Sequence, residues 1–501
     1  MEALGPFQPT SSTRAAPASR VSRRSRRISL PSLRLNVSER RLLLAVVDVL
    51  LLNAALFVVL SIRGTVGFSL AILSEAPEYF ILLTVLWWIW ASFFDCYSLP
   101  RTADASQSAW ATARAGLLTA LVYLAIPLYT PHLPASRLSS LLFVGSVSAS
   151  IPAWRLIYAT VFSQPSFQRR VLVVGAGQSG AELARVLTAT PDHGNPYAGS
   201  GYRMVGFVDD DPSIGHTRVE GMPVLGNRYD LAALIRDHSV DLLVVAITHT
   251  PEIHPELFQL LLDCREQGVG LESMTSLYER LTGKVSVEHA GRDLAVVMPA
   301  TDSPVQHLFS FAKRVFDLVV GIFGLVLLAL VAPWVALATA ISGPGPLFYP
   351  QVRVGKGGKP FVLYKFRSMI PTAEEGCGAV WACEHDDRVT PVGRLLRKTR
   401  LDELPQFWNV LKGDMSLVGP RPERPEFVQE LLKVVPFYQV RHAVRPGITG
   451  WAQVRYRYGS SLEDSLVKLE FDLYYIKRQS VYLELSIMVK TAAVILGLKG
   501  R

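Results

Sequence analysis

Cysteine and charge are both scarce in this chain of 501 residues. Its four cysteines, at positions 96, 264, 377 and 383, form no CxxC pair, which argues against a disulfide framework and a cysteine-bound zinc site. Charged residues make up only 19% of the chain and hydrophobic residues 50%, a balance typical of membrane proteins. The net charge is +9, and the basic residues lie beside apolar runs. This favours an anionic membrane surface and anionic substrates as partners, and not nucleic acid.

The N-terminal third predicts a membrane domain. Residues 1–40 are rich in Ser, Pro and Arg and predict a disordered basic tail that is not a cleaved signal peptide. A four-helix transmembrane domain is expected at 41–163, because four apolar stretches there are each about long enough to cross a ~30 Å hydrocarbon layer. These stretches are 42–62, 79–98, 115–131 and 138–162. The basic flanks place both ends of this domain in the cytoplasm.

One acidic residue lies inside the first of these stretches. Asp48 is costly in lipid, so we expect it to face the interior of the bundle. We expect a packing role and not a transport role, on the premise that no second intramembrane charge accompanies it.

Residues 168–300 predict a Rossmann-like α/β domain. Strands are expected at 170–174, 205–208 and 241–247, and helices at 181–187 and 255–267. Gly175, Gly177 and Gly180 form a GxGxxG motif between the first strand and its helix, where a dinucleotide pyrophosphate would approach a helix N-terminus. The motif alone is weak evidence, and the following connection is long. A structural or regulatory domain is therefore favoured over cofactor binding.

A fifth apolar run covers 315–341. The sequence after it is as basic as the sequence before it, which indicates that both ends lie on the cytoplasmic side. Pro333 would break the helix, so a bend at Ala332 and Pro333 would return the chain to the face it entered. We favour this re-entrant hairpin over a fifth membrane span, which hydropathy alone also allows.

The remainder, 344–501, predicts a mixed α/β domain. A hairpin is expected at 348–354 and 359–367, a helix after Thr390 and Pro391, and a last helix at about 480–498. The last helix could lie in the membrane interface or pack on the domain.

Two adjacent carboxylates, Asp402 and Glu403, are the most informative feature of this domain. They follow the basic residues Arg394, Arg397, Lys398 and Arg400 and precede an apolar helix. Acids beside that much positive charge stay ionised, which suits a nucleophile or a metal ligand better than a proton donor. One carboxylate could attack while the other binds a cation. The alternative is a polar turn that starts a helix at Pro405.

Further motifs favour the first interpretation. Lys365 and Arg367 end the hairpin, and Arg421 and Arg445 each lie beside proline in a rigid turn; the motifs span 365–369, 413–422, 444–451 and 471–475. Together they resemble the long bacterial monotopic phosphoglycosyl transferases, also called undecaprenyl-phosphate hexose-1-phosphate transferases. The resemblance is specific over 308–501 and less so over the N-terminal helices and the α/β domain.

The resemblance implies a two-step transfer. Asp402 would attack the sugar-bearing phosphorus of a UDP-hexose, and undecaprenyl phosphate would then take the phosphosugar from the carboxylate. Glu403 would bind Mg²⁺, while Lys365, Arg397, Arg421 and Arg445 would lie around phosphates, with Arg353 and Arg367 as weaker candidates. At the hairpin break, this chain has Ala332 where relatives often have serine.

The resemblance also implies a setting. It predicts a multi-pass protein of the bacterial inner membrane with a cytoplasmic catalytic domain that contacts membrane lipids and starts exopolysaccharide or capsule synthesis. Glucose and galactose are the favoured hexoses, and a homodimer through the α/β domain is expected.

Two rival functions belong to other classes. One is an NAD-dependent nucleotide-sugar-modifying enzyme, but no lysine in the chain has tyrosine four residues before it, as the usual Tyr-x-x-x-Lys pair requires. The other is a non-catalytic membrane scaffold of polysaccharide assembly, which the intact pair of acids and the set of cations disfavour.

Overall fold

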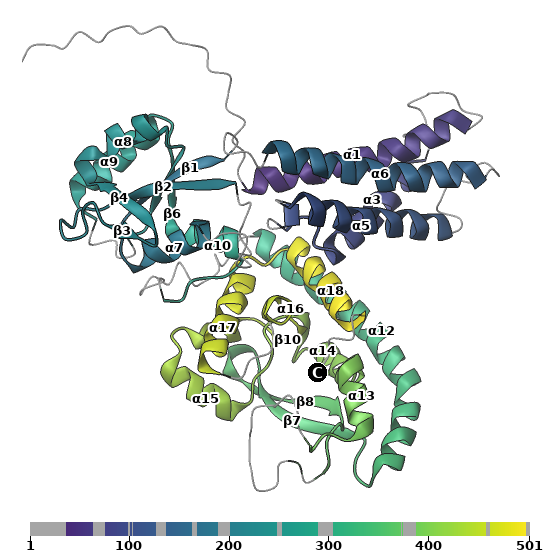
Figure 1. The fold of residues 1–501 in the computed structure, drawn as a ribbon. Helices are drawn as coiled ribbons and strands as arrows, with labels where there is room; N and C mark the ends of the chain where they lie inside the picture. Colours follow the sequence, from purple (N-terminus) through teal and green to yellow (C-terminus); the bar gives the residue numbers. More distant parts are fainter. Residues whose placement is uncertain are drawn as a thin grey trace, which may run out of the picture. The chain divides into compact units, whose positions relative to one another are not determined.

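The computed structural model describes twelve stretches of the chain. These are residues 37–63, 76–98, 101–102, 104–126, 137–162, 168–188, 201–247, 253–288, 304–371, 373, 387–456 and 461–496. The predicted basic tail lies almost wholly outside them, as do Cys377 and Cys383. Figure 1 traces the helices and strands.

The N-terminal region is helical. It contains α1 (Val37–Arg63), α3 (Pro77–Phe93), α5 (Ala105–Ala125) and α6 (Arg137–Phe162), which pack around the fully buried Trp87, Tyr123 and Phe143. By length and composition, α1 and α6 could each cross a membrane, whereas α3 is apolar but shorter. Among the described residues, two of the four predicted spans therefore qualify, and a third candidate lies further along the chain in α12 (Pro304–Ser342).

Asp48 faces the interior of this region, as predicted, but it is not the only charge there. Arg155 of α6 donates from Nε to Asp48 Oδ1 at 3.2 Å and from Nη1 to the Cys96 carbonyl at 3.1 Å, and both charged side chains are fully buried. The premise that no second charge accompanies Asp48 was wrong. The two residues are 107 positions apart, so they meet only when α1 packs on α6. A buried acid requires such a partner.

The α/β domain contains a six-stranded sheet in the order β3-β4-β2-β1-β5-β6, parallel except for the β3–β4 pair. The predicted strands at 170–174, 205–208 and 241–247 correspond to β1, β2 and β5, and the predicted helices to α7 and α9. The strands are β1 (Arg169–Val174), β2 (Tyr202–Val208), β3 (Arg218–Val219), β4 (Met222–Gly226), β5 (Leu242–Val245) and β6 (Gly270–Ser273), and the helices are α7 (Gln178–Thr188), α8 (Leu231–His238), α9 (Pro255–Glu266) and α10 (Met274–Thr282).

The C-terminal domain is built on α12 and a hairpin. Strands β7 (Phe348–Val354) and β8 (Pro360–Phe366) pair antiparallel, which confirms the predicted hairpin. The predicted helix after Thr390 is α13, capped by the Thr390 hydroxyl. The other elements are η5 (Lys356–Gly358), α13 (Pro391–Thr399), η6 (Leu401–Glu403), α14 (Gln406–Lys412), β9 (Ser416–Val418), α15 (Pro425–Val434), η7 (Tyr438–Ala443), β10 (Gly447–Thr449), α16 (Trp451–Arg455), α17 (Leu462–Lys477) and α18 (Val481–Leu496).

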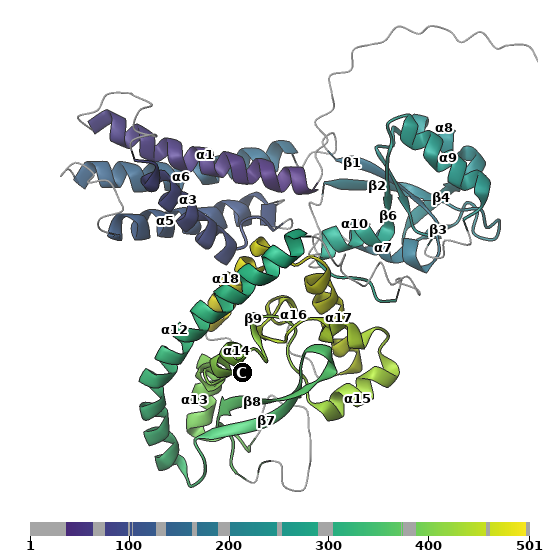
Figure 2. The same ribbon diagram turned by 180° about the vertical axis from the view of Figure 1, so that it is seen from behind.

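Helix α12 runs without interruption through Pro333, so the predicted helix break at that residue was wrong. Figure 2 shows a curved helix instead of two separate ones. A proline inside a helix removes one hydrogen bond and bends the axis without having to end the helix. Its outward face is apolar and exposed over most of its length; it includes Phe316, Ile322, Phe323, Val326, Leu330, Trp334, Leu337 and Ile341.

Both ends of α12 contact the C-terminal domain. Near its start, Asp317 Oδ1 accepts hydrogen bonds from the Ser416 hydroxyl and the Leu417 amide, each at 3.0 Å. Near its end, Val335 packs with Phe366 and neighbouring residues, which are also buried. Between these ends, Gly324 lies against Phe407, and Leu328 and Val331 pack on the same cluster, so one face of the helix follows the domain along most of its length.

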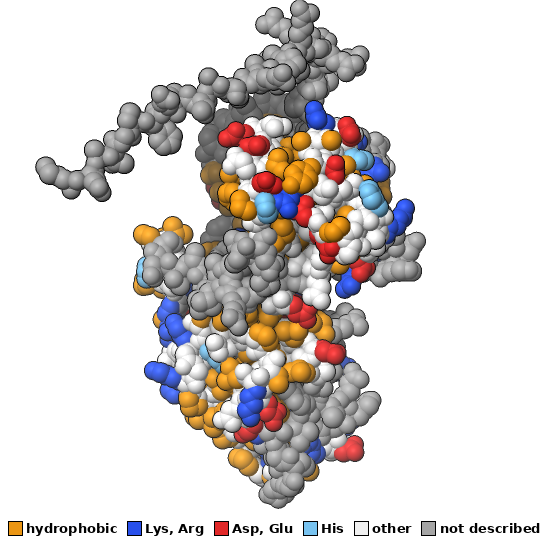
Figure 3. All heavy atoms as spheres, turned by 90° about the vertical axis from the view of Figure 1, so that its left-hand side faces the viewer, with side chains coloured by type: hydrophobic (Ala, Val, Ile, Leu, Met, Phe, Trp, Pro, Cys, Tyr) orange, Lys and Arg blue, Asp and Glu red, His pale blue; other side chains and the backbone are white. Residues whose placement is uncertain are grey.

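The surface drawn in Figure 3 carries acidic and basic side chains interspersed with apolar ones. On this face no field of a single sign covers the residues that the structure describes.

Candidate functional site

The two acids lie on a short 3₁₀ turn between two helices. Arg400 ends α13 in the left-handed region, with φ 60° and ψ 12°, and η6 begins directly after it. Pro405 directly precedes α14 and lacks an amide hydrogen, so one helical hydrogen bond is missing between η6 and α14. Asp402 and Glu403 are both buried there. Leu404 and Pro405, which join η6 to α14, both keep right-handed helical backbone angles.

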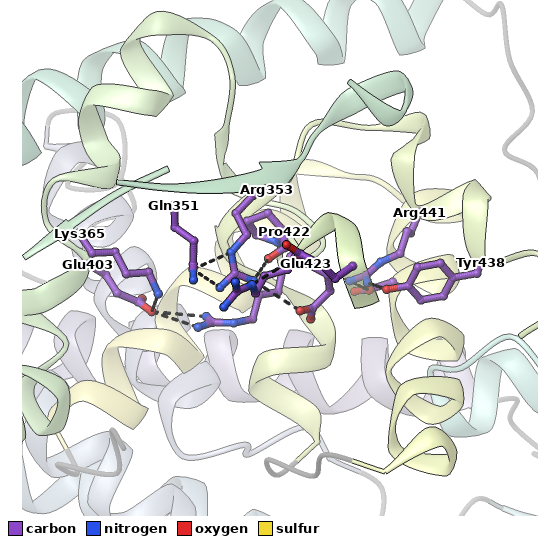
Figure 4. A network of polar contacts seen from close by, with 12 residues as sticks. Gln351, Arg353, Lys365, Glu403, Pro422, Glu423, Tyr438 and Arg441 are labelled. Atoms are coloured by element: carbon purple, nitrogen blue, oxygen red, sulfur yellow. Dashed lines mark hydrogen bonds and ion pairs between the residues drawn. The ribbon is translucent and has the colours of Figure 1, made fainter. Parts of the chain in front are cut away.

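Three cationic side chains lie close to one carboxylate oxygen of Glu403. Arg400 and Arg421 each lie 3.4 Å from Glu403 Oε1, and Lys365 Nζ lies 4.0 Å from the same atom. Figure 4 shows Lys365 and Glu403 directed toward one another. Burial alone would raise the pKa of Glu403, but Arg421, Lys365 and Arg400 together hold it below its usual value. Glu403 is therefore an anion at neutral pH.

Asp402 has a different environment. Burial, and then the charge of Glu403, raise the pKa of Asp402 to about 6, against the opposing effect of Lys365 and Arg397. Its Oδ1 atom is buried and has no hydrogen-bond partner among the described residues. An ionised, poorly solvated oxygen of this kind is a better nucleophile than one that is hydrogen-bonded. The two acids thus have different surroundings: Glu403 forms ion pairs through one oxygen, whereas Asp402 has an oxygen without a hydrogen-bond partner among the described residues.

Lys365 reaches the acids from the hairpin. Burial, and then Arg421, lower the pKa of Lys365 to about 8, so it is still mostly a cation at pH 7. Its strand is tied to the helix after the acids by Asn409 of α14. The Asn409 side chain accepts from the Tyr364 amide at 3.2 Å and donates to the Val362 carbonyl at 2.7 Å. This fully buried amide fixes β8 against α14.

Arg421 is held by a second set of buried charges. Arg441 Nη2 donates to the Arg421 carbonyl and to Asp472 Oδ2, each at 2.9 Å, and Nη1 donates to the Tyr438 hydroxyl. Figure 4 shows Arg441 and Tyr438 at one end of the same network. Asp472 and Arg441 are thus positioned to hold the backbone from which Arg421 extends to Glu403.

Arg353 braces the same loop from the hairpin. It donates to the Pro422 carbonyl at 3.0 Å, to the Gln351 side chain, and forms an ion pair with Glu423 at 3.6 Å. Burial lowers the pKa of Arg353 to about 10. In the structure it orders the loop and does not contact the two acids.

The remaining predicted cations lie in three different places. Arg397 donates to the Ser368 hydroxyl at 2.9 Å and acts on Asp402 through its charge. Arg367 donates to the carbonyls of Thr339, Gly343 and Pro344, where it caps the end of α12. Arg445 is exposed between β9 and β10. Lys365, Arg397 and Arg421 therefore lie around the acids, whereas Arg367, Arg353 and Arg445 do not contact them.

The acids suit a hard cation. Among the described residues, no group of three or more His, Cys, Asp or Glu side chains could hold a metal by itself. Mg²⁺, however, commonly uses one or two carboxylates and completes its coordination with substrate phosphates. Glu403 and the buried, unpartnered Asp402 Oδ1 supply oxygen donors of that type.

The glycine motif of the α/β domain follows β1. Gly175 has φ 105°, and a Cβ at Gly180 would overlap the Gly175 carbonyl, so both positions require glycine for local packing. The Ala176 amide donates to Asp209 Oδ2 at 2.6 Å. An amide that could face a phosphate is therefore already bound to a carboxylate of the same domain.

Two site residues were absent from the predicted set. Arg400 was noted only as part of a basic stretch, although its guanidinium touches Glu403. Arg441 was not considered, because a lone arginine in the sequence gives no sign that it will be buried under Arg421. Asp472 lies in the 471–475 motif, but no role was predicted for it.

Comparison with known proteins identifies two domains. A family model described as bacterial sugar transferase matches residues 308–497, and one described as CoA-binding domain matches residues 92–271. The first contains every residue of the acidic site described above.

Several relatives of known function are similar over long segments. The chain is 39% identical over 60% of its length to a UDP-N-acetylgalactosamine-undecaprenyl-phosphate N-acetylgalactosaminephosphotransferase of Aeromonas hydrophila, covering 69% of that protein. It is 32% identical over 66% of its length to a UDP-glucose:undecaprenyl-phosphate glucose-1-phosphate transferase of Xanthomonas campestris pv. campestris, covering 67% of it. A UDP-galactose-lipid carrier transferase of Erwinia amylovora is 26% identical over 92% of this chain and 97% of its own length.

The match to the Erwinia protein spans both domains and the helical region, so the resemblance is not confined to the acidic site. The chain therefore belongs to the bacterial sugar transferase family of undecaprenyl-phosphate sugar-1-phosphate transferases, in the long form that its motifs predicted.

Proposed function

We propose that this enzyme transfers a hexose 1-phosphate from a UDP-hexose to undecaprenyl phosphate through a covalent intermediate on Asp402. The observation that carries the proposal is the contrast between the two acids. Glu403 is held by three cations, whereas the neighbouring Asp402 has a buried oxygen without a hydrogen-bond partner among the described residues.

The first step forms an acyl phosphate. A carboxylate oxygen of Asp402 attacks the sugar-bearing phosphorus of UDP-hexose, the bond from that phosphorus to the bridging oxygen breaks, and UMP leaves with the electron pair. In the second step, a phosphate oxygen of undecaprenyl phosphate attacks the same phosphorus and the Asp402 carboxylate is regenerated. Neither step requires a general acid, because the leaving groups are a phosphate and a carboxylate. Positioning and charge neutralisation therefore provide most of the catalysis.

The cations around the acids suit this chemistry. Lys365, Arg397, Arg400 and Arg421 carry four positive charges against the two negative charges of the acids. The excess of two matches the charge of a diphosphate. Mg²⁺, when bound by Glu403, would supply further neutralisation of the diphosphate oxygens.

Helix α12 supports a position at the membrane surface. Its exposed apolar face suits lipid, while both of its ends contact the C-terminal domain. A helix that packs on a polar domain by one face and exposes an apolar face on the other side can lie in one leaflet without carrying that domain across the membrane. We propose that α12 lies in this way, with both ends on the cytoplasmic side, and keeps the catalytic domain at the inner membrane, where a lipid phosphate and a soluble UDP-sugar can meet.

The names of the relatives leave the sugar open among glucose, galactose and N-acetylgalactosamine. We keep glucose and galactose as the favoured sugars. We also propose that the enzyme starts exopolysaccharide or capsule synthesis and that it forms a homodimer through the α/β domain. Turnover of each UDP-sugar by the purified protein with undecaprenyl phosphate identifies the substrate, and sizing in nanodiscs tests the dimer.

The variant Asp402→Asn tests the nucleophile. Asparagine has the shape of aspartate but cannot form the acyl phosphate, so we expect release of UMP from radiolabelled UDP-hexose to fall by about 10³-fold or more. The thermal midpoint should stay near that of the parent, because the lost oxygen has no partner among the described residues. Glu426→Gln, at an exposed acid of α15, is the matched control and should retain activity. Transfer by Asp402→Asn at the parent rate would refute the mechanism.

A further inference from the structure

Arg400 has a backbone conformation that few residues other than glycine adopt. With φ 60° and ψ 12°, it is at once the C-cap of α13 and the N-cap of η6. Its amide donates to the Arg397 carbonyl, and its own carbonyl accepts from the Glu403 amide, both at 3.2 Å. Left-handed backbone is unfavourable for a side chain with a Cβ, and glycine would relieve it. A non-glycine residue in such a conformation points to a role for its side chain.

The Arg400 side chain is directed into the site. Its Nη1 lies 3.4 Å from Glu403 Oε1, and its charge also acts on Asp402. The side chain is 20% exposed, whereas that of Glu403 is 10% exposed. The guanidinium therefore bridges the buried acids and the solvent from which a substrate arrives.

Three cations lie around a single carboxylate oxygen, so positive charge exceeds negative charge there. Arg400, Arg421 and Lys365 all lie within 4.0 Å of Glu403 Oε1. Together the two acids carry two negative charges against the four positive charges of Lys365, Arg397, Arg400 and Arg421, so a phosphate that enters would meet an excess of positive charge. A guanidinium offers five N–H donors in a planar fork, which suits phosphate oxygens.

We propose that Arg400 is a phosphate-contacting residue of the catalytic centre, held over Glu403 by its left-handed backbone and able to bind a phosphate oxygen of the substrate. The inference rests on the proposed function and deepens it. The phosphate belongs either to the diphosphate of the UDP-sugar or to the lipid acceptor, which share this chemistry. Because the residue directly precedes η6, its side chain and the two acids are presented by one rigid turn.

The variant Arg400→Gly separates the side chain from the backbone. Glycine accepts positive φ, so the turn should form and the thermal midpoint should stay at or above that of the parent. Loss of a charge-assisted contact should raise the KM of one substrate by about 10- to 100-fold. A rise for UDP-hexose assigns Arg400 to the donor diphosphate, and a rise for undecaprenyl phosphate assigns it to the lipid phosphate. Arg400→Lys keeps the charge without the fork and should recover part of the loss.

Two controls and one direct measurement complete the test. Lys398→Ala removes an exposed cation from the same helix and should leave both KM values within about twofold. Ser239→Gly places glycine at another left-handed position, in the α/β domain, and should have no effect on activity. Titration of UDP into the Asp402→Asn protein measures binding without turnover, and adding Arg400→Gly should weaken it about tenfold if the donor is the ligand.

The outcomes distinguish this inference from the proposed function. A parent enzyme without transfer activity refutes the function, whereas an active parent with unchanged KM values in Arg400→Gly refutes only the role of Arg400. A fall in the thermal midpoint of Arg400→Gly would contradict the argument that its backbone is strained. The Arg400→Lys variant then tests the phosphate contact by itself, because KM values equal to those of the parent would show that the contact does not need a guanidinium.

Discussion

Asp472 and Arg441 show how a residue far from the reacting atoms can govern the site. The pair is buried, and through Arg441 it holds the carbonyl of Arg421, whose side chain contacts Glu403. Burial, opposed by Arg441, raises the pKa of Asp472 to about 6. At neutral pH the acid is therefore mainly ionised and paired. We expect the activity proposed for Asp402 and Glu403 to depend on this pair, because it sets the position of one of the three cations.

We predict that Asp472→Asn is both less stable and less active. Removing one charge of a buried pair leaves the other unpaired, which costs about 3–5 kcal/mol. The thermal midpoint should fall, and kcat/KM should fall with it because Arg421 loses its anchor. The double variant Asp472→Asn with Arg441→Gln should be more stable than the single variant, because no unpaired charge remains. A thermal midpoint of Asp472→Asn equal to that of the parent would show that the pair does not hold the loop. Glu426→Gln is the control, because it removes the charge of an exposed acid in the same domain.

At the scale of the element, α12 and α14 approach closely beneath the acids. A Cβ at Gly324 would overlap the Phe407 ring, and one at Gly321 would lie 2.8 Å from Leu411. Arg314 adds hydrogen bonds to the carbonyls of Val410 at 2.7 Å and Leu411 at 2.9 Å. Because α14 begins three residues after Glu403, α12 and the turn that carries the two acids share one packing interface.

We therefore predict that Gly324→Ala disturbs the site through α14. The added methyl group must displace Phe407, an overpacking that costs about 1–3 kcal/mol and moves the start of α14. Both the thermal midpoint and the rate of UMP release should fall. The further change Phe407→Leu should restore part of each. Gly145→Ala, in α6, introduces the same methyl group where no atom lies within 4 Å, and it should be neutral or stabilising. Parent-like behaviour of Gly324→Ala would mean that the two helices are not tightly coupled.

The sequence predicted elements whose signals are local. The hairpin has alternating residues and a glycine-rich tip, and α13 has a Thr cap followed by proline, so both could be predicted from neighbouring residues. The acids were found in the same way, since Asp402 and Glu403 are adjacent. In contrast, Arg155 and Arg441 meet Asp48 and Asp472 only in the folded chain.

The helix through Pro333 was missed for a different reason. Proline is a strong local signal for a break, but the flanking residues are apolar helix formers, and the remaining hydrogen bonds of a long helix can keep it continuous around one missing donor. The phosphate contact expected of Arg367 stays a prediction. The sequence shows its charge but not the carbonyls at the end of α12 that it binds.

At the scale of the whole molecule, the course of α12 determines where the chemistry occurs. It is 39 residues long, enough to span a membrane, and its apolar face is exposed. A spanning helix would place the chain after it on the opposite side from the chain before it. Yet Arg314 and Asp317 near its start, and Val335 and Thr339 near its end, contact the same domain. We therefore keep the prediction, made from the basic flanks, that both ends of α12 lie on one side of the membrane.

We predict that cysteines at both ends of α12 react from the cytoplasm. In a protein whose four natural cysteines are replaced by serine, Ser310→Cys and Ser342→Cys lie at exposed positions near the two ends of the helix. A membrane-impermeant maleimide added to intact cells should label neither, whereas it should label both after permeabilisation. Glu78→Cys, at the exposed start of α3, should be labelled from outside if the charge distribution around the first helices orients them as predicted. Labelling of Ser342→Cys but not Ser310→Cys in intact cells would show a spanning α12 and place Asp402 outside the cytoplasm. UDP-sugars could not then reach it from the cytoplasmic pool, and the proposed reaction would have to be abandoned.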